Sequence, residues 1–314
     1  MQKILLMLFV SAFVHTLQAQ VRYPFPLQRF VFQVEGKTSY MSYMDVQPVN
    51  GNGKTILLLH GKNFSGYYWK EVIPVLQARG YRVIVPDLPG FGRSGKPDLH
   101  YSFHMLSAIN KSLLDSLNIG QVIVIGHSMG GMLAIRFTLL FPAVTDKLIL
   151  ENPIGLEDYK TFIPYKTLDQ LYAKEKSATY ESYKKYQQSY YPEWKSVYEQ
   201  YVAAQAEALS DPGFDSIARV NAITYQMIYE QPVIYELKRI TQPVLFIIGQ
   251  ADRTVVGKDL LAEDQKKRFG QYPQLGKEAA ARIKNAKLIE LPGLGHIPHV
   301  QDFPAFTKAL LSFL

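Results

Sequence analysis

The hydrophobic positions of this chain follow two alternating patterns. Continuous runs of Val, Ile and Leu indicate buried strands, whereas apolar residues three to four positions apart indicate helices. The expected strands cover residues 55–59, 81–85, 121–125, 147–150, 244–248 and 287–291, and the expected helices cover residues 67–78, 103–117, 131–137 and 304–314. Strands and helices in alternation predict a mostly parallel sheet that is flanked by helices on both faces.

Two segments depart from this alternation. Residues 30–46 alternate apolar and polar positions around Glu35-Gly36-Lys37, a turn signal, which predicts a β-hairpin before the first parallel strand. Residues 154–239 have no strand pattern and contain 13 of the 21 tyrosines, so we expect a helical cap inserted after the sixth strand. Its aromatic side chains either pack the cap onto the core or line a pocket. The predicted core therefore consists of residues 20–153 and 240–314.

Residues 1–19 have the pattern of a secretory signal peptide. Lys3 supplies a positive charge, residues 4–17 are mostly apolar, and Ala19 precedes the expected cleavage site before Gln20. The apolar stretch of about 14 residues is shorter than the roughly 20 residues that a membrane span needs. We therefore expect cleavage and export to the periplasm or the extracellular space, without stable membrane insertion. An uncleaved membrane anchor is the alternative.

The composition gives no sign of a nucleic-acid partner. The net charge is +7, but the longest basic run, Lys266-Lys267-Arg268, has only three residues. The chain has no Cys, no His-Glu-x-x-His motif and no phosphate-binding Gly loop. The sequence therefore predicts no cofactor and no metal, and it favours a small, partly apolar molecule as the partner. It does not indicate an oligomeric state.

The most specific chemical signal is the pentapeptide Gly126-His127-Ser128-Met129-Gly130. It follows a strand pattern and precedes a helix pattern, so Ser128 lies on a sharp turn between them. Such a turn strains the serine backbone and lifts the hydroxyl clear of the sheet. Glycines two positions before and after the serine let the strand and the helix pass close together. The pattern predicts that Ser128 is a nucleophile.

A serine hydroxyl needs a base to accept its proton and an acid to orient that base. His296 is the predicted base, because its Gly-rich loop follows the last strand at the sheet edge where ligand sites form. Asp252, just after the strand at 244–248, is the predicted acid. Glu151, at the end of the preceding strand, is the rival acid or an assisting residue. We expect His299 to pack or form hydrogen bonds nearby.

Two backbone N–H groups are expected to bind the oxyanion that forms when a serine attacks a carbonyl. One belongs to Met129, directly after Ser128. The other belongs to Lys62, in the loop that follows the strand at 55–59. The side-chain amide of Asn63 is a candidate for assisting. We interpret the Lys62 side chain as a solvated surface group rather than an anion anchor.

Five motifs, spread over about residues 30–314, resemble those of lidded α/β-hydrolase-fold proteins. They are Leu58-Leu59-His60-Gly61, Pro86-Asp87-Leu88-Pro89-Gly90-Phe91-Gly92-Arg93-Ser94, Gly126-His127-Ser128-Met129-Gly130-Gly131, Gly249-Gln250-Ala251-Asp252-Arg253 and Gly293-Leu294-Gly295-His296. The resemblance implies an α/β-hydrolase fold and a serine hydrolase that cleaves a carboxylic ester or related acyl compound. Epoxide hydrolases and haloalkane dehalogenases of this group use an Asp nucleophile, and position 128 is Ser.

Two other functions stay open. A hydrolase of lactones or of activated carbon–carbon bonds would use the same triad. A ligand-binding member of the fold without catalysis is the alternative from another class, and the complete triad argues against it.

Overall fold

The structure is a computed structural model, and it describes residues 21–314. The predicted signal peptide, residues 1–19, lies outside the described residues. In the described part of the chain, no helix is both long enough and apolar enough to cross a membrane.

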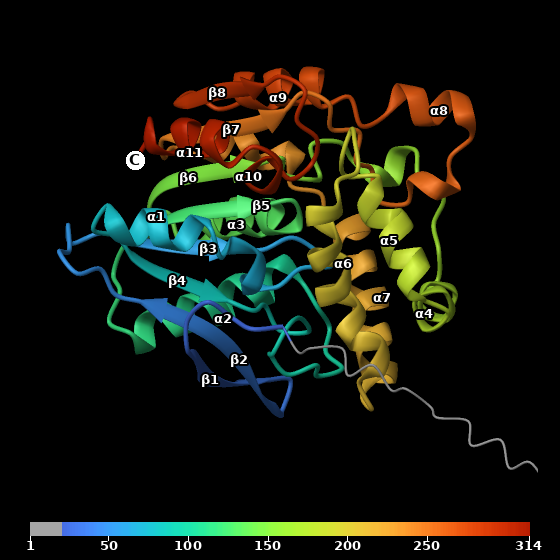
Figure 1. Cartoon of the computed structure of the whole chain (residues 1–314), viewed down its shortest axis with the longest axis horizontal. Helices are drawn as coiled ribbons and strands as arrows, with labels where there is room; N and C mark the ends of the chain where they lie inside the picture. Colours follow the sequence, from blue (N-terminus) through green and yellow to red (C-terminus); the bar gives the residue numbers. More distant parts are fainter. Residues whose placement is uncertain (1–20) are drawn as a thin grey trace, which may run out of the picture.

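Eight strands form one sheet in the order β1-β2-β4-β3-β5-β6-β7-β8 (Figure 1). The strands are β1 (Leu27–Val34), β2 (Lys37–Val46), β3 (Thr55–Leu59), β4 (Arg82–Pro86), β5 (Val122–His127), β6 (Thr145–Glu151), β7 (Val244–Gly249) and β8 (Ala286–Leu291). β1 and β2 form the expected hairpin, and β2 also pairs antiparallel with β4. The remaining neighbours are parallel. The prediction of a mostly parallel sheet is confirmed.

Helices cover both faces of this sheet. On one face lie α1 (Val72–Ala78) and α11 (Phe303–Leu311), and on the other lie α2 (Phe103–Ser116), α3 (Met129–Leu140) and α9 (Tyr272–Ala281). β3 shows why its sequence is an uninterrupted apolar run: Leu57 and Leu59 pack into one core, while Ile56 and Leu58 pack into the other. A strand that is buried on both faces has no polar side.

Four cap helices lie between β6 and β7, where the sequence predicts a helical insert. They are α4 (Leu168–Lys176), α5 (Tyr180–Gln188), α6 (Glu199–Ala206) and α7 (Phe214–Glu230). Figure 1 shows them together beyond one end of the sheet, and α8 (Glu263–Arg268) also lies on this side. The strands β3, β5, β6, β7 and β8 are parallel, so their carboxyl ends meet at one edge of the sheet.

Two elements differ from the sequence prediction. The expected helix over residues 67–78 is a 3₁₀ turn at Gly66–Trp69 followed by the shorter α1. Pro74 explains the break, because a proline has no N–H to donate and is tolerated only in the first turn of a helix. α9 was not expected at all. A glycine, Gly276, interrupts the apolar pattern of its sequence. The glycine lets α9 pack closely on β7, where a Cβ at position 276 would lie 3.0 Å from the side chain of Ile248.

Candidate active site

Ser128 lies between β5 and α3 in a backbone conformation that a side chain rarely adopts. Its φ is 56° and its ψ is −120°, a strain worth about 1–3 kcal/mol. The turn is tight, since a Cβ at Gly126 would lie 2.3 Å from the carbonyl oxygen of Gly130. A Cβ at Gly130 would lie 2.2 Å from the carbonyl oxygen of Leu59. Both glycines are therefore required by the close approach that puts Ser128 at the end of its strand.

The structure brings three of the expected site residues into one hydrogen-bonded chain. The Oγ of Ser128 lies 2.9 Å from Nε2 of His296. On the other side of the ring, Nδ1 of His296 lies 2.7 Å from Oδ2 of Asp252. The three residues follow β5, β8 and β7, and all three are buried. A buried carboxylate that accepts from Nδ1 fixes Nε2 as the acceptor that faces the serine hydroxyl.

Asp252 is held by two further donors, one of which sequence reasoning missed. Asn152 donates from Nδ2 to Oδ2 of Asp252 at 2.7 Å, and Thr254 donates its N–H to Oδ1 at 2.8 Å. Burial acts to raise the pKa of Asp252, but His296 and the hydrogen bonds from Thr254 outweigh it and hold the pKa below its usual value. The carboxylate therefore stays ionised.

Asn152 owes its position to an unusual backbone. Its φ is 37°, and its Oδ1 accepts the N–H of Gly249 at 2.9 Å. The side chain thus joins the ends of β6 and β7 under the carboxylate of Asp252. Asn is among the residues that tolerate positive φ best. An Asn directly after a strand end was the signal that could have pointed to this role.

Glu151, the predicted rival acid, is bonded to His299 and not to the predicted base His296. Its carboxylate accepts the backbone N–H of His299 at 2.8 Å and lies 2.9 Å from Nδ1 of the same residue. No hydrogen bond or ion pair joins Glu151 to His296 in the described residues. Glu151 therefore holds α10 (Pro298–Gln301), which begins two residues after His296.

A second network that the sequence did not reveal lies behind Ser128. Nε2 of His127 is 2.9 Å from the carbonyl oxygen of His296, and Nδ1 of His127 is 2.9 Å from the hydroxyl of Tyr68. Burial, followed by the charges of His296 and His299, keeps the pKa of His127 well below its usual value. Because a carbonyl only accepts, neutral His127 donates from Nε2 and accepts from Tyr68. Tyr68 in turn accepts the N–H of Gly61 at 3.0 Å.

This network places the loop after β3 against Ser128. A Cβ at Gly61 would lie 3.0 Å from Cβ of Ser128 and 3.1 Å from Nδ1 of His127, so a side chain there would have to push one of them aside. Lys62 and Asn63 follow directly, and Asn63 adopts a positive φ of 71°. The Lys62 side chain is not solvated as expected. Only 12% of it is exposed, and its Nζ lies 3.7 Å from Oε1 of Glu175 in α4.

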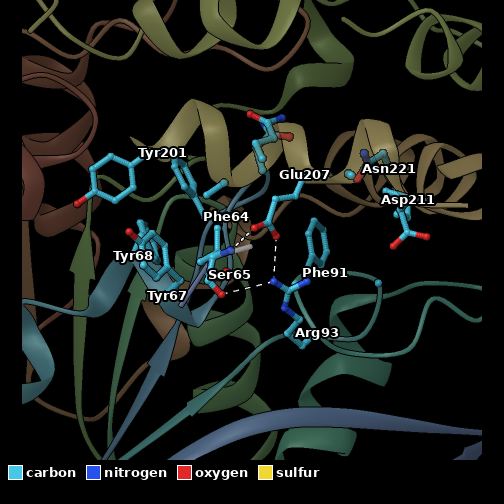
Figure 2. Close-up of a pocket in the computed structure, with 18 of the residues that line it drawn as sticks. Phe64, Ser65, Tyr67, Tyr68, Phe91, Arg93, Tyr201, Glu207, Asp211 and Asn221 are labelled. Atoms are coloured by element: carbon cyan, nitrogen blue, oxygen red, sulfur yellow. Dashed lines mark hydrogen bonds and ion pairs between the residues drawn. The ribbon is translucent and has the colours of Figure 1, made fainter. Parts of the chain in front are cut away.

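A separate cavity of about 130 Å³ lies between the cap and the core (Figure 2). Phe64, Phe91 and Tyr201 contribute aromatic walls. Arg93 from the core and Glu207 from the cap form an ion pair of 3.0 Å inside it. Ser128, His296 and Asp252 do not line this cavity, whereas Asn63 and Tyr68 do. Tyr201 shows that cap tyrosines line a cavity, whereas others pack on one another.

A metal site would need several His, Cys, Asp or Glu side chains close together. Among residues 21–314, no three His, Cys, Asp or Glu side chains are grouped as a metal site would need.

Comparison with known proteins agrees with this architecture. The sequence model of the alpha/beta hydrolase fold family matches residues 54–303. The crystal structure of a probable hydrolytic enzyme from Pseudomonas aeruginosa superposes with a TM-score of 0.92 and 43% identity, over 95% of this chain and 99% of that chain.

Two curated relatives match a shorter region. A haloalkane dehalogenase from Psychrobacter cryohalolentis is 35% identical over 113 residues, which are 35% of this chain and 33% of that protein. A 2-hydroxy-6-oxo-6-phenylhexa-2,4-dienoate hydrolase from Burkholderia cepacia is 38% identical over 112 residues, or 34% of this chain and 38% of that protein. The chain spans about a third of the length of the curated relatives it matches.

The fold and the site define a member of a hydrolase class. The chain belongs to the alpha/beta hydrolase fold family, as its five sequence motifs indicated.

Proposed function

We propose that this protein is a serine hydrolase that cleaves a carboxylic ester or a related acyl compound through an acyl-enzyme on Ser128. The observation that supports this best is the hydrogen-bonded chain from Ser128 through His296 to Asp252. It begins at a strained, glycine-flanked turn, which is the arrangement that activates a serine hydroxyl.

The proposed reaction proceeds in two acyl transfers. Nε2 of His296 takes the proton of the Ser128 hydroxyl while Oγ attacks the carbonyl carbon. The resulting imidazolium is stabilised by Asp252, and it then protonates the leaving alcohol as the carbon–oxygen bond breaks. A water molecule gives its proton to His296 and attacks the acyl carbon. The bond to Oγ then breaks, the carboxylic acid leaves, and Ser128 regains its proton.

The backbone N–H groups of Met129 and Lys62 are the proposed oxyanion donors. Met129 is the first residue of α3, so its N–H has no earlier helical turn to donate to. Lys62 follows Gly61, whose backbone lies against Ser128. Donors that are fixed before the reaction are worth about 2.7–4 kcal/mol each in enzymes of this kind.

A lactone or carbon–carbon bond hydrolase with the same triad is the second candidate. The 38% identity to a dienoate hydrolase, which extends over 34% of this chain, favours this second candidate. A panel of p-nitrophenyl esters of increasing acyl length, simple lactones and a conjugated dienone acid separates the two. We expect the highest kcat/KM on an ester and loss of that activity in Ser128→Ala. Turnover of the dienone with no ester turnover would reject the ester assignment and keep the triad.

We also propose that the protein is exported, on the signal pattern of residues 1–19.

A further inference from the structure

One cap residue contacts the proposed base directly. Tyr190 follows α5, and its carbonyl oxygen accepts the backbone N–H of His296 at 2.8 Å. Its ring stacks on the imidazole of His296, with centroids 4.9 Å apart and planes at 29°. The backbone approach is close, because a Cβ at Gly295 would lie 2.2 Å from the carbonyl oxygen of Tyr190. Main chain and side chain of Tyr190 therefore both hold the loop that carries the base.

The hydroxyl of the same tyrosine reaches the opposite side of the site. Asn63 donates from Nδ2 to the Tyr190 hydroxyl at 3.3 Å. Asn63 is the residue after Lys62 and has a positive φ of 71°. Burial keeps the pKa of Tyr190 well above its usual value, so this hydroxyl stays neutral. Tyr190 is thus a buried bridge between the base and the proposed oxyanion loop.

We propose that Tyr190 is a positioning residue of this hydrolase: its ring stabilises the protonated form of His296, and its hydroxyl holds the oxyanion loop through Asn63. This inference rests on the proposed function. A cation within about 6 Å of an aromatic face is attracted by the ring quadrupole, in addition to the stacking that a neutral imidazole also has. His296 is a cation only after it has taken the serine proton, so the ring favours the transition state over the ground state.

The other groups around His296 allow this effect to be measured. Ser128 faces Nε2, Asp252 faces Nδ1, and the rings of His127 and Tyr272 lie 4.9 Å and 6.4 Å away. Asp252 supplies the negative charge among them, and buried His127 is neutral. None of these residues is substituted when residue 190 is replaced, so a shift in the acid limb of the rate profile reports the Tyr190 ring.

The test is the pH profile of kcat/KM on p-nitrophenyl acetate. Loss of the ring removes a stabiliser of the protonated imidazole, so the acid limb of the rate profile moves to lower pH. For Tyr190→Leu we expect a shift of about half a unit to one unit and a fall in kcat/KM of roughly three- to thirtyfold. Tyr190→Phe keeps the ring, so its acid limb stays in place, with a loss of about two- to tenfold from the missing hydrogen bond.

Two further variants keep the test decisive. Tyr198 is a buried cap tyrosine that stacks on Tyr191 at 4.0 Å, so Tyr198→Leu controls for lost packing and should leave the pH profile unchanged. If Tyr190→Leu fails to fold, Tyr190→pentafluorophenylalanine replaces it, because fluorination removes the negative face at nearly the same ring shape. Its acid limb should lie below that of Tyr190→Phe.

The inference is overturned if the acid limb of Tyr190→Leu, or of the pentafluorophenylalanine variant, lies at the same pH as that of Tyr190→Phe. Ser128→Ala, measured alongside, distinguishes a failure of the proposed function from a failure of the role of Tyr190. If it keeps the parent's activity, the proposed function has failed. If it is inactive while the Tyr190 variants show no shift, only the role of Tyr190 has failed.

Discussion

Two buried acids lie near the proposed base, and exchanging each for its amide should separate catalysis from stability. Asp252 accepts from three donors, on His296, Asn152 and Thr254. An amide has only one acceptor oxygen, so in Asp252→Asn at least one of these donors faces an NH₂ group. The variant also loses the negative charge that stabilises the imidazolium of His296. We expect kcat to fall on the order of 10⁴-fold, or about 5 kcal/mol in activation free energy.

Glu151→Gln should give the opposite result. The carboxylate of Glu151 binds the N–H and the ring of His299, and in the described residues no hydrogen bond joins it to His296. Weakening hydrogen bonds to a buried charged group lowers the free energy of unfolding by about 1–3 kcal/mol. For a domain of this size, that corresponds to a Tm lower by about 2–10 °C. We expect kcat of the folded variant to stay within about tenfold of the parent.

The assay measures kcat on a p-nitrophenyl ester and Tm by circular dichroism for both variants and the parent. Activity is normalised to the folded fraction at the assay temperature. The reasoning is refuted if Glu151→Gln loses more activity than Asp252→Asn, because the acid would then lie after β6.

The remaining predictions concern the support of the acid, the turn and the export signal. Asn152→Asp puts a second carboxylate against Asp252, which raises the depressed pKa of Asp252 and adds negative charge beside the imidazolium of His296, so the acid limb of kcat/KM should move to higher pH in a rate profile. Gly130→Ala should cost about 3 kcal/mol or more in a urea titration, because its Cβ would meet the Leu59 backbone, whereas Gly120→Ala, with nothing within 4 Å, should leave the midpoint unchanged. Mass spectrometry of protein from a secreting host should find a mature chain that begins at or near Gln20, and an intact Met1 on membrane-bound protein would contradict export.

The sequence predicted the sheet and its edge well, because both depend on local patterns. Runs of Val, Ile and Leu mark the central parallel strands, because a strand that is buried on both faces carries apolar side chains on both. Ser128 and Asp252 follow strands of this kind, and His296 follows β8, the parallel strand at the end of the sheet. Parallel strands place their carboxyl ends at one edge, which is why three positions far apart in the sequence meet.

The residues that support the site could not be predicted in the same way. Asn152, His127 and Tyr68 act through contacts between segments that no periodicity connects. Glu151 and Asn152 are neighbours in sequence, yet only Asn152 turns toward Asp252, because its positive φ redirects the side chain. The Lys62 side chain was expected in solvent, but the cap helix α4 covers it and supplies Glu175. Such outcomes depend on how the cap docks.

The most direct test of the central claim is the covalent labelling of Ser128. The protein is incubated with a fluorophosphonate, which reacts with activated serine hydroxyls, and is then examined by intact mass and peptide mapping. We predict one adduct, on the peptide that contains Ser128, with loss of esterase activity in proportion to labelling. Ser128→Ala should take up no label. Stoichiometric labelling of Ser128→Ala, or ester hydrolysis by that variant within tenfold of the parent, would contradict the account.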